Sequence, residues 1–369
     1  MRPRARISTP AFAALLVGGI ALLALGSAGV CSPAMLLHGW LAALLLLLGP
    51  TLGAVMLLAL HELTGGAWGM VLRRSAAASA RRLGWLLIPA LLPVLIGVAR
   101  LYPWAQPGAA DDPLLVHRAP WLSWEPVLLR AGLYLLVWVA GGLLLGRGRP
   151  GARSGLASAV GILFVLTIGL ACVDWVVALE RSFYTSVLGL DLVVMSGLGG
   201  LATFVLLLPL VEPAPTPSVR RDLGNLLLAM QALHVYLQFS QFLIVYSGDQ
   251  PQEIAWYLTR TTRGWSTLAW VVVLGHYALP LACLLPRAVK RHQARLGAVC
   301  ALILVGHLVE AWWWVLPAAG PPSPALFLGG LAAALVLGGA WALGLVLARD
   351  LPPDLAFDRP LTERGATHG

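Results

Sequence analysis

Long apolar stretches separated by short polar segments run along almost the whole chain. A helix needs about 20 mostly apolar residues to cross the hydrocarbon core of a bilayer. Stretches of this kind lie near residues 11–30, 34–60, 83–101, 126–146, 155–179, 186–211, 223–245, 265–286, 296–316 and 325–348. They lack the alternation of apolar and polar positions that lipid-facing strands of a membrane barrel show. The pattern therefore predicts an all-α integral membrane protein with about ten transmembrane helices.

The composition supports the same class. Of the 369 residues, 59% are hydrophobic and only 11% are charged, so the chain cannot form a single water-soluble core. The connecting segments are too short for a separate folded domain. We therefore expect one polytopic membrane domain over residues 1–369, in which residues 350–369 form a flexible, polar cytoplasmic tail.

The first apolar stretch has a second interpretation. Arg2, Arg4 and Arg6 precede it, and small residues follow it, which is also the pattern of a secretory signal. The residues before Cys31 make a poor lipoprotein cleavage site. We therefore expect residues 11–30 to remain as the first transmembrane helix, with a cleaved signal as the alternative.

Basic residues in the loops predict the orientation. Most of the 25 Lys and Arg residues fall on the side that also carries both ends of the chain. The opposite side has only Arg100, Arg118, Arg181, Arg260 and Arg263. Because cytoplasmic loops carry the excess of basic residues, both termini are predicted to be cytoplasmic. The formal net charge of +9 then reflects topology and attraction to anionic lipid head groups, and it gives no reason to expect nucleic-acid binding.

The cysteines do not predict a redox or metal centre. Cys31, Cys172, Cys283 and Cys300 are scattered, without the paired spacing of zinc or iron–sulfur ligands, and no CxxCH haem-attachment motif occurs. We therefore expect no metal site and no covalently bound cofactor on this chain. Any electron transfer would need cofactors held by other subunits.

The predicted helix at 223–245 carries a row of polar side chains. Gln231, His234, Gln238 and Gln241 follow one another at spacings that place all four on one helix face. Such a face should point into the protein, because polar groups facing lipid are costly. Two interpretations remain open. The face either forms hydrogen bonds between helices, or it lines a proton path or a quinone headgroup site.

Further ionisable residues lie in or beside other predicted spans. His307 and Glu310 share one helix face, and His276 lies at the same predicted depth as His234 and His307, near the membrane midplane. The remaining candidates are Asp174 and Gln241 nearer the outer side, and His61 and Glu62 on the cytoplasmic side. Together they form a discontinuous row of proton-path or quinone-site candidates. The alternative for each histidine is a hydrogen-bonded core residue.

Two charged residues are predicted to pair. Asp174 and Arg130 each lie about one turn inside the outer boundary of their helices, where an isolated charge would be costly. Buried ions are generally paired, so we expect these two to form a structural ion pair. Asp191 is expected to reach the outer interface.

The loop from Gly248 to Gly264 mixes charged and aromatic residues. Trp256 and Tyr257 are typical of the aromatic belt at a membrane surface. Aromatic and arginine side chains are also favoured at the centres of protein interfaces. The loop is therefore either an interfacial belt or a docking surface for periplasmic subunits.

Four segments carry a resemblance to a known family. They are QFSQFLIVYSGDQPQEIAW at Gln238–Trp256, HELTGGAWG at His61–Gly69, LYPWAQP at Leu101–Pro107 and DWVVALERSFYTSVLGL at Asp174–Leu190. With these motifs the chain resembles the NrfD-like, polysulfide-reductase-type membrane subunits. Within that family it is most similar to the second membrane subunit, called quinone-binding subunit 2, of the quinol:cytochrome c oxidoreductase alternative complex III. The resemblance covers roughly Leu37 to Pro317.

The resemblance implies a fold and a set of partners. The expected fold is two four-helix bundles, helices two to five and six to nine, flanked by helices one and ten. The expected setting is the cytoplasmic (inner) membrane of a bacterium, in a complex with a multihaem cytochrome, an iron–sulfur protein and a second NrfD-like subunit. Quinone or quinol is the implied ligand, and the chain alone is not expected to be catalytic. Relatives tend to have Arg-x-x-Asp where this chain has His307 and Glu310.

Two other functions fit the hydropathy pattern alone. An ion or solute transporter would also need polar residues inside its spans, together with helices interrupted at matching positions of two repeats. Only Pro50 and Pro280 suggest such interruptions. A purely structural membrane scaffold, in which every buried polar group serves packing, is the third alternative.

Overall fold

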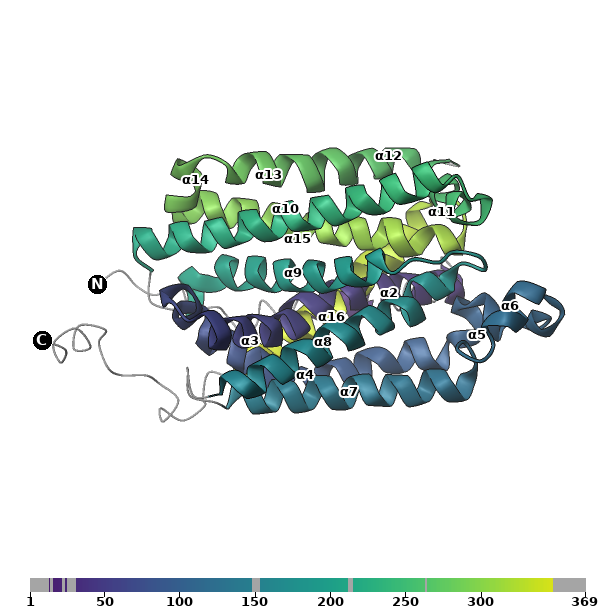
Figure 1. The fold of residues 1–369 in the computed structure, drawn as a ribbon, viewed down its shortest axis with the longest axis horizontal. Helices are drawn as coiled ribbons and strands as arrows, with labels where there is room; N and C mark the ends of the chain where they lie inside the picture. Colours follow the sequence, from purple (N-terminus) through teal and green to yellow (C-terminus); the bar gives the residue numbers. More distant parts are fainter. Residues whose placement is uncertain are drawn as a thin grey trace, which may run out of the picture.

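The computed structural model describes residues 31–147, 153–211, 215–262 and 264–347, together with residues 13, 16–21 and 24. Every regular element in these ranges is a helix (Figure 1). Nine helices in the described ranges are long and apolar enough to cross a membrane by length and composition. They indicate an all-α, multi-pass membrane protein, as the hydropathy pattern predicts.

The long helices follow the order of the predicted spans. The first runs from α2 (Pro33–Leu48) through the π-helix η2 (Gly49–Gly53) into α3 (Ala54–Thr64), and the next five are α4 (Ala67–Ile96), α7 (Trp124–Gly146), α8 (Ser154–Trp175) with η5 (Val177–Leu179), α9 (Val187–Val211) and α10 (Pro217–Gly248). The seventh runs from α12 (Ser266–Trp270) through the π-helix η6 (Val271–Ala278) into α13 (Leu279–Leu284). The last two are α15 (Gln293–Val315) with η7 (Leu316–Ala319), and α16 (Pro324–Leu347). Short helices connect them, namely α5 (Val98–Leu101), η3 (Pro103–Ala105), η4 (Ala109–Asp111), α6 (Pro113–Arg118), α11 (Pro251–Thr261) and α14 (Arg287–Arg291).

The long helices lie roughly side by side, so their ends gather at two ends of the molecule (Figure 1). One end holds α5, α6 and α11, and we call it the α11 end. The opposite end holds α14 and the last turns of α3 and α16, and we call it the α14 end. The basic residues Arg287, Lys290 and Arg291 of α14 lie at this end.

Most span boundaries agree with the prediction to within a few residues, but α4 does not. It begins at Ala67, well before the predicted start at residue 83. The added segment is rich in Ala and Arg, which are strong helix formers, so the helix continues beyond its apolar part. The predicted first span and the predicted tail lie largely or wholly outside the described residues. Within the first span, residues 16–21 are helical, and Leu16 lies against Gly339 of α16.

Glycines allow two close helix contacts in the centre of the protein. A Cβ atom added at Gly53 would lie 2.2 Å from the carbonyl oxygen of Ser196 in α9. One added at Gly142 of α7 would lie 2.4 Å from the carbonyl oxygen of Ala80 in α4. Small residues therefore bring these backbones together, which is a common means of helix association in lipid.

Residues 248–264, expected to form a loop, lie at the α11 end. They include the helix α11, and its Trp256 and Arg260 are 2% and 0% exposed. Arg260 donates to Glu180 Oε1 at 3.0 Å and to the carbonyl oxygen of Trp314 at 2.7 Å. Burial lowers the pKa of Arg260 to about 10, although Glu180 opposes this shift. These two side chains thus join α11 to α15. Gln252 and Leu258 of the same helix are exposed, so the interfacial belt and the docking surface both stay predictions.

Candidate functional site

A buried cluster of ionisable residues lies between α9, α10, η6 and α15. At its centre, His234 contacts two carboxylates at once: Nδ1 lies 2.8 Å from Asp191 Oδ1, and Nε2 lies 3.0 Å from Glu310 Oε2. All three side chains are at most 1% exposed. One imidazole therefore connects carboxylates from α9 and α15 across the protein interior.

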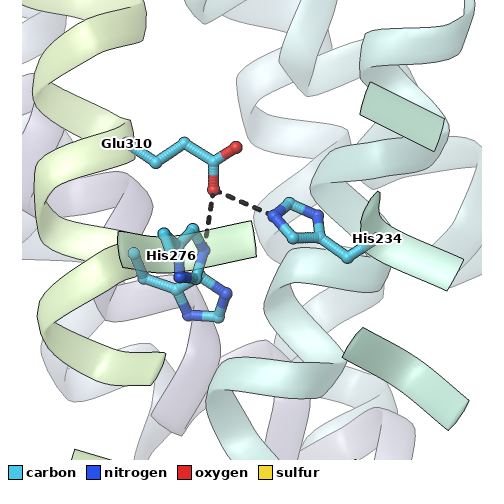
Figure 2. A group of neighbouring side chains, drawn as sticks. His234, His276 and Glu310 are labelled. Carbon is cyan, nitrogen blue, oxygen red and sulfur yellow. Dashed lines mark hydrogen bonds and ion pairs between the residues drawn. The ribbon is translucent and has the colours of Figure 1, made fainter. Parts of the chain in front are cut away.

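Glu310 joins several elements through its two oxygens. Oε2 faces both His234 and His276, whose Nε2 lies 3.2 Å away (Figure 2). Oε1 accepts hydrogen bonds from Tyr277 Oη at 2.6 Å and from Gln238 Nε2 at 3.0 Å. Because each oxygen has close polar neighbours, the carboxylate is held in one orientation.

The helix α10 supplies the polar face that its spacing predicts. Gln231, His234, Gln238 and Gln241 are all buried. Gln238 donates to Asp191 Oδ2 at 2.6 Å as well as to Glu310. Gln231 donates to the backbone carbonyl of His276 at 2.8 Å, which fastens η6 to α10. The polar face therefore points into the protein.

His276 is positioned by two local features. It lies in the π-helix η6, and insertions of this kind are frequent at functional sites because they redirect side chains. Its ring lies against Gly306 of α15, where an added Cβ atom would be 2.0 Å from Nδ1. Only glycine at position 306 leaves room for this ring position.

The third histidine completes a group of metal-ligand type. The His307 ring lies 4.8 Å from the His276 ring and 5.8 Å from the His234 ring, measured between centroids. Ligand atoms of the three histidines and Glu310 all lie within 4.8 Å of one another. Histidine and carboxylate are suitable ligands for a divalent transition metal, so this group has the residue types for one. The sequence spacing gave no indication of this group, because its members come from three different helices and include no cysteine.

The charge of the cluster limits its protonation states. Two buried carboxylates at one site repel each other and lose their hydration. A positive charge on His234, between Asp191 and Glu310, would offset part of this cost. Nε2 of His307, which can donate or accept a hydrogen bond depending on the tautomer, has no partner among the described residues.

Asp174 and Arg130 lie in a different network. Arg130 Nη2 is 2.7 Å from Asp174 Oδ1, and Nε is 3.0 Å from Oδ2. Trp121 Nε1 and Tyr134 Oη also donate to this carboxylate, at 3.0 and 2.9 Å. The carboxylate of Asp174 therefore has four donor contacts from α7 and the segment before it. This saturation fits the structural ion pair that the sequence predicts.

His61 and Glu62, which are predicted to lie on the cytoplasmic side, form a third group. His61 Nε2 lies 3.1 Å from the carbonyl oxygen of Gly66, and Glu62 pairs with Arg73 at 2.9 Å. Both residues end α3 at the turn to α4, where Gly65 has a φ of 67° that other residues rarely adopt. These contacts join α3 to the turn and to α4, whereas the His234 contacts join α9, α10 and α15, so the predicted candidates fall into three groups.

Sequence reasoning missed two members of the central cluster. Asp191 was expected at the outer interface, but it is 1% exposed and contacts His234. Its position inside a span was a usable signal, since ionisable residues there are usually functional or paired. Tyr277 gave no comparable signal, because tyrosine is common near membrane surfaces. Gln241 contacts Thr185 instead of the cluster, and it extends the polar row toward the α11 end.

Comparisons with known proteins do not identify a family for this chain. The sequence matches no protein-family model, and a search of curated proteins found no match. The functional argument therefore rests on the residues themselves. Its central group consists of His234, Asp191, Glu310, His276 and His307, all at most 2% exposed.

Proposed function

We propose that the chain is an integral membrane subunit of a respiratory quinol:cytochrome c oxidoreductase, and that its central cluster transfers protons. The observation that carries this proposal is the position of His234 between two buried carboxylates. Ionisable residues inside membrane spans are costly and are found where protons or ions pass. Neutral and protonated imidazole differ by one proton near physiological pH, so histidine suits this role.

The contacts of His234 define a transfer step. A proton on Glu310 moves to Nε2 while the proton on Nδ1 moves to Asp191, so one proton enters and one leaves. The ring must then turn, or exchange its proton with a neighbouring group, before the next transfer. Gln238 contacts both carboxylates and holds them in place during this step.

Electron transfer belongs to other subunits in this proposal. The cysteines of the chain are separate from one another, and those of the described spans are free. Quinol oxidation would then occur with partners that hold haem and iron–sulfur centres, which this chain anchors at the α11 end. A quinone or quinol is the small molecule expected near the subunit.

The resemblance of four motifs to NrfD-like subunits supports a specific arrangement. We propose two groups of four membrane helices. The first is α3, α4, α7 and α8, which contact one another in turn, and the second is α9, α10, α15 and the helix formed by η6 and α13. The α14 end would face the cytoplasm of a bacterial inner membrane, because its loops carry most of the basic residues.

A purification experiment tests the complex. The tagged chain is extracted in mild detergent, its partners are identified by mass spectrometry, and quinol:cytochrome c reductase activity is measured on the eluate. We expect multihaem and iron–sulfur subunits together with activity. A homogeneous protein without partners or activity would contradict the proposal.

Substitution of the cluster tests proton transfer. We expect His234→Leu and Glu310→Gln to lower proton-coupled turnover at least about tenfold while assembly is retained, since a missing acid–base group typically costs more than that. The measurement is proton yield and turnover in proteoliposomes of the purified complex. His38→Leu is a matched control, because His38 is also buried but bonds only to the carbonyl of Ala34.

Two outcomes would count against proton transfer at the cluster. Wild-type proton yield in both variants would remove the cluster from the path. A stoichiometric metal ion in the purified complex, lost in His307→Ala, would assign the four ligand residues to metal binding. Metal content is measured on the same samples by elemental analysis.

The transporter alternative has weaker support. Two π-helical segments interrupt the membrane helices, η2 and η6. In chain order, η2 interrupts the first helix of one proposed group, whereas η6 interrupts the third helix of the other group. Repeat-based transporters interrupt helices at corresponding positions. The two segments therefore do not favour a repeat-based transporter.

A further inference from the structure

A pocket of about 500 Å³ lies between α4 and α16, towards the α14 end. Its walls combine cationic, aromatic and small side chains. They include Ser79, Arg81, Arg82, Trp85, Trp341 and Gly344. Gly344 lies in the last turn of α16, so the pocket opens close to where this helix leaves the membrane region.

The floor of the pocket is fixed by hydrogen bonds between three elements. Trp341 donates to Ser79 Oγ at 2.9 Å, and Ser79 donates to the carbonyl of Pro50 at 2.5 Å. Arg82 donates to the carbonyl oxygen of Gly344, which joins α4 to α16 at the rim. These hydrogen bonds hold η2, α4 and α16 in fixed positions around the pocket.

Positive charge at the pocket has no counter-ion among the residues that the structure describes. Arg81 and Arg82 both line the pocket, and the side chain of Arg81 packs against Gly146, next to Arg147. None of the three forms an ion pair with a described residue, whereas Arg73 on the same helix pairs with Glu62. Like charges at the edge of a low-dielectric region repel one another, and an anion between them would remove that repulsion.

The surface next to the arginines is apolar and open. Trp85 is 88% exposed and lies one turn after Arg81 on α4. Leu83, Leu86 and Leu345 also line the pocket. Trp85 lies where the apolar part of α4 begins, and tryptophan beside basic residues at such a boundary is typical of the head-group level of a membrane. A ligand here would meet charge at one end and an apolar wall at the other.

We propose that this pocket binds an anionic phospholipid. The phosphate lies between Arg81 and Arg82, and an acyl chain follows the surface of Trp85 and Leu86. Basic pockets between membrane helices on the cytoplasmic side are suited to such head groups, because charge attraction and apolar contact act on one molecule. The site is independent of the proposed proton transfer, which involves other residues.

The first test compares head groups. The full chain, with any subunits that co-purify, is delipidated in mild detergent and titrated with phosphatidylglycerol or phosphatidylcholine, and bound lipid is counted by native mass spectrometry. We expect one tightly bound phosphatidylglycerol. Removing two basic contacts in Arg81→Gln/Arg82→Gln should weaken its binding about thirtyfold. Arg74→Gln is the control, because Arg74 is exposed on the same helix but does not line the pocket.

The second test blocks the pocket without changing its charge. A Cβ atom added at Gly344 has no neighbour within 4 Å, so Gly344→Leu can be accommodated and fills the space beside Arg82. We expect this variant to lose the bound phosphatidylglycerol. Gly338→Leu on the same helix is the matched control, because Gly338 also has no neighbour within 4 Å and lies outside the pocket.

Several results would overturn the proposal. Equal binding of phosphatidylcholine would remove the role of charge. Full displacement of phosphatidylglycerol by inorganic phosphate would assign the site to a free anion. Retention of the lipid in both the double arginine variant and Gly344→Leu would place it elsewhere. A cross-link from position 344 to a co-purified subunit would make the pocket a protein interface.

Discussion

At the residue scale, the chain separates two kinds of buried charge. Asp174 accepts contacts from Arg130, Tyr134 and Trp121, so its carboxylate is saturated by fixed donors. His234 instead lies between two acidic groups. A guanidinium keeps its proton under all ordinary conditions, whereas an imidazole exchanges one. The first group therefore suits structure, and the second suits proton transfer.

The structural role of Asp174 can be tested by its stability cost. Asp174→Asn leaves Arg130 without its buried counter-ion, so we expect a loss of about 2–4 kcal/mol in the free energy of unfolding. Tyr134→Phe removes one hydrogen bond to the same carboxylate and should cost about 1 kcal/mol. Both are measured by thermal melting of the purified protein in detergent. A melting temperature of Asp174→Asn equal to wild type would contradict the assignment.

At the element scale, the π-helix η6 and the glycine facing it position the side chain of His276 in the central cluster. η6 carries His276, and α15 provides Gly306 against its ring. The extra residue per turn in a π-helix changes which side chains face the neighbouring helix. Neither feature adds a charge to the cluster, and both determine where a histidine lies.

Substitution of Gly306 isolates this effect. Gly306→Ala places a methyl group within 2.0 Å of the His276 ring position, so the ring must move away from Glu310. We expect proton-coupled turnover to fall several-fold, although alanine favours the helix by about 1 kcal/mol. Gly161→Ala is the control, since an added Cβ there has no neighbour within 4 Å. Unchanged turnover in Gly306→Ala would show that the position of His276 is unimportant.

At the scale of the whole molecule, the two ends differ in charge and in loop structure. The α11 end contains α6 and α11, and Arg260 joins its segments internally. The α14 end contains most of the basic loops. The proposed lipid pocket also lies towards the α14 end. If this end faces the cytoplasm, as proposed above, anionic lipid of that leaflet is available to the pocket.

Cysteine labelling tests the orientation. We expect Gln252→Cys to react with a membrane-impermeant maleimide in intact cells, and Thr64→Cys to react only after the membrane is opened. Both positions are exposed and lie at opposite ends of the molecule. The native cysteines of the described ranges are buried or half-buried, so their background labelling is low. The reverse pattern would place the α14 end outside.

The sequence predicted the helices better than it predicted their contacts. The span of α7 was expected at 126–146 and is observed at Trp124–Gly146. By contrast, α4 begins early because its Ala-rich first half has helix propensity without being apolar. The inward polar face of α10 followed from its spacing alone. The contact of this face with Asp191 did not, because it depends on how α9 is rotated.

Composition and hydropathy by themselves determined the all-helical membrane class, the order of the spans and the inward position of His234. These follow from the sequence because a bilayer forces each spanning segment to satisfy its own backbone hydrogen bonds, whatever its neighbours are. Only the tertiary structure decided that Asp191, Glu310, His276 and His307 meet around His234, and that Arg81 and Arg82 line one pocket with Gly344. These contacts depend on how separate helices rotate and pack against one another. Small residues and π-helical segments determine that packing, and a local sequence pattern does not specify it.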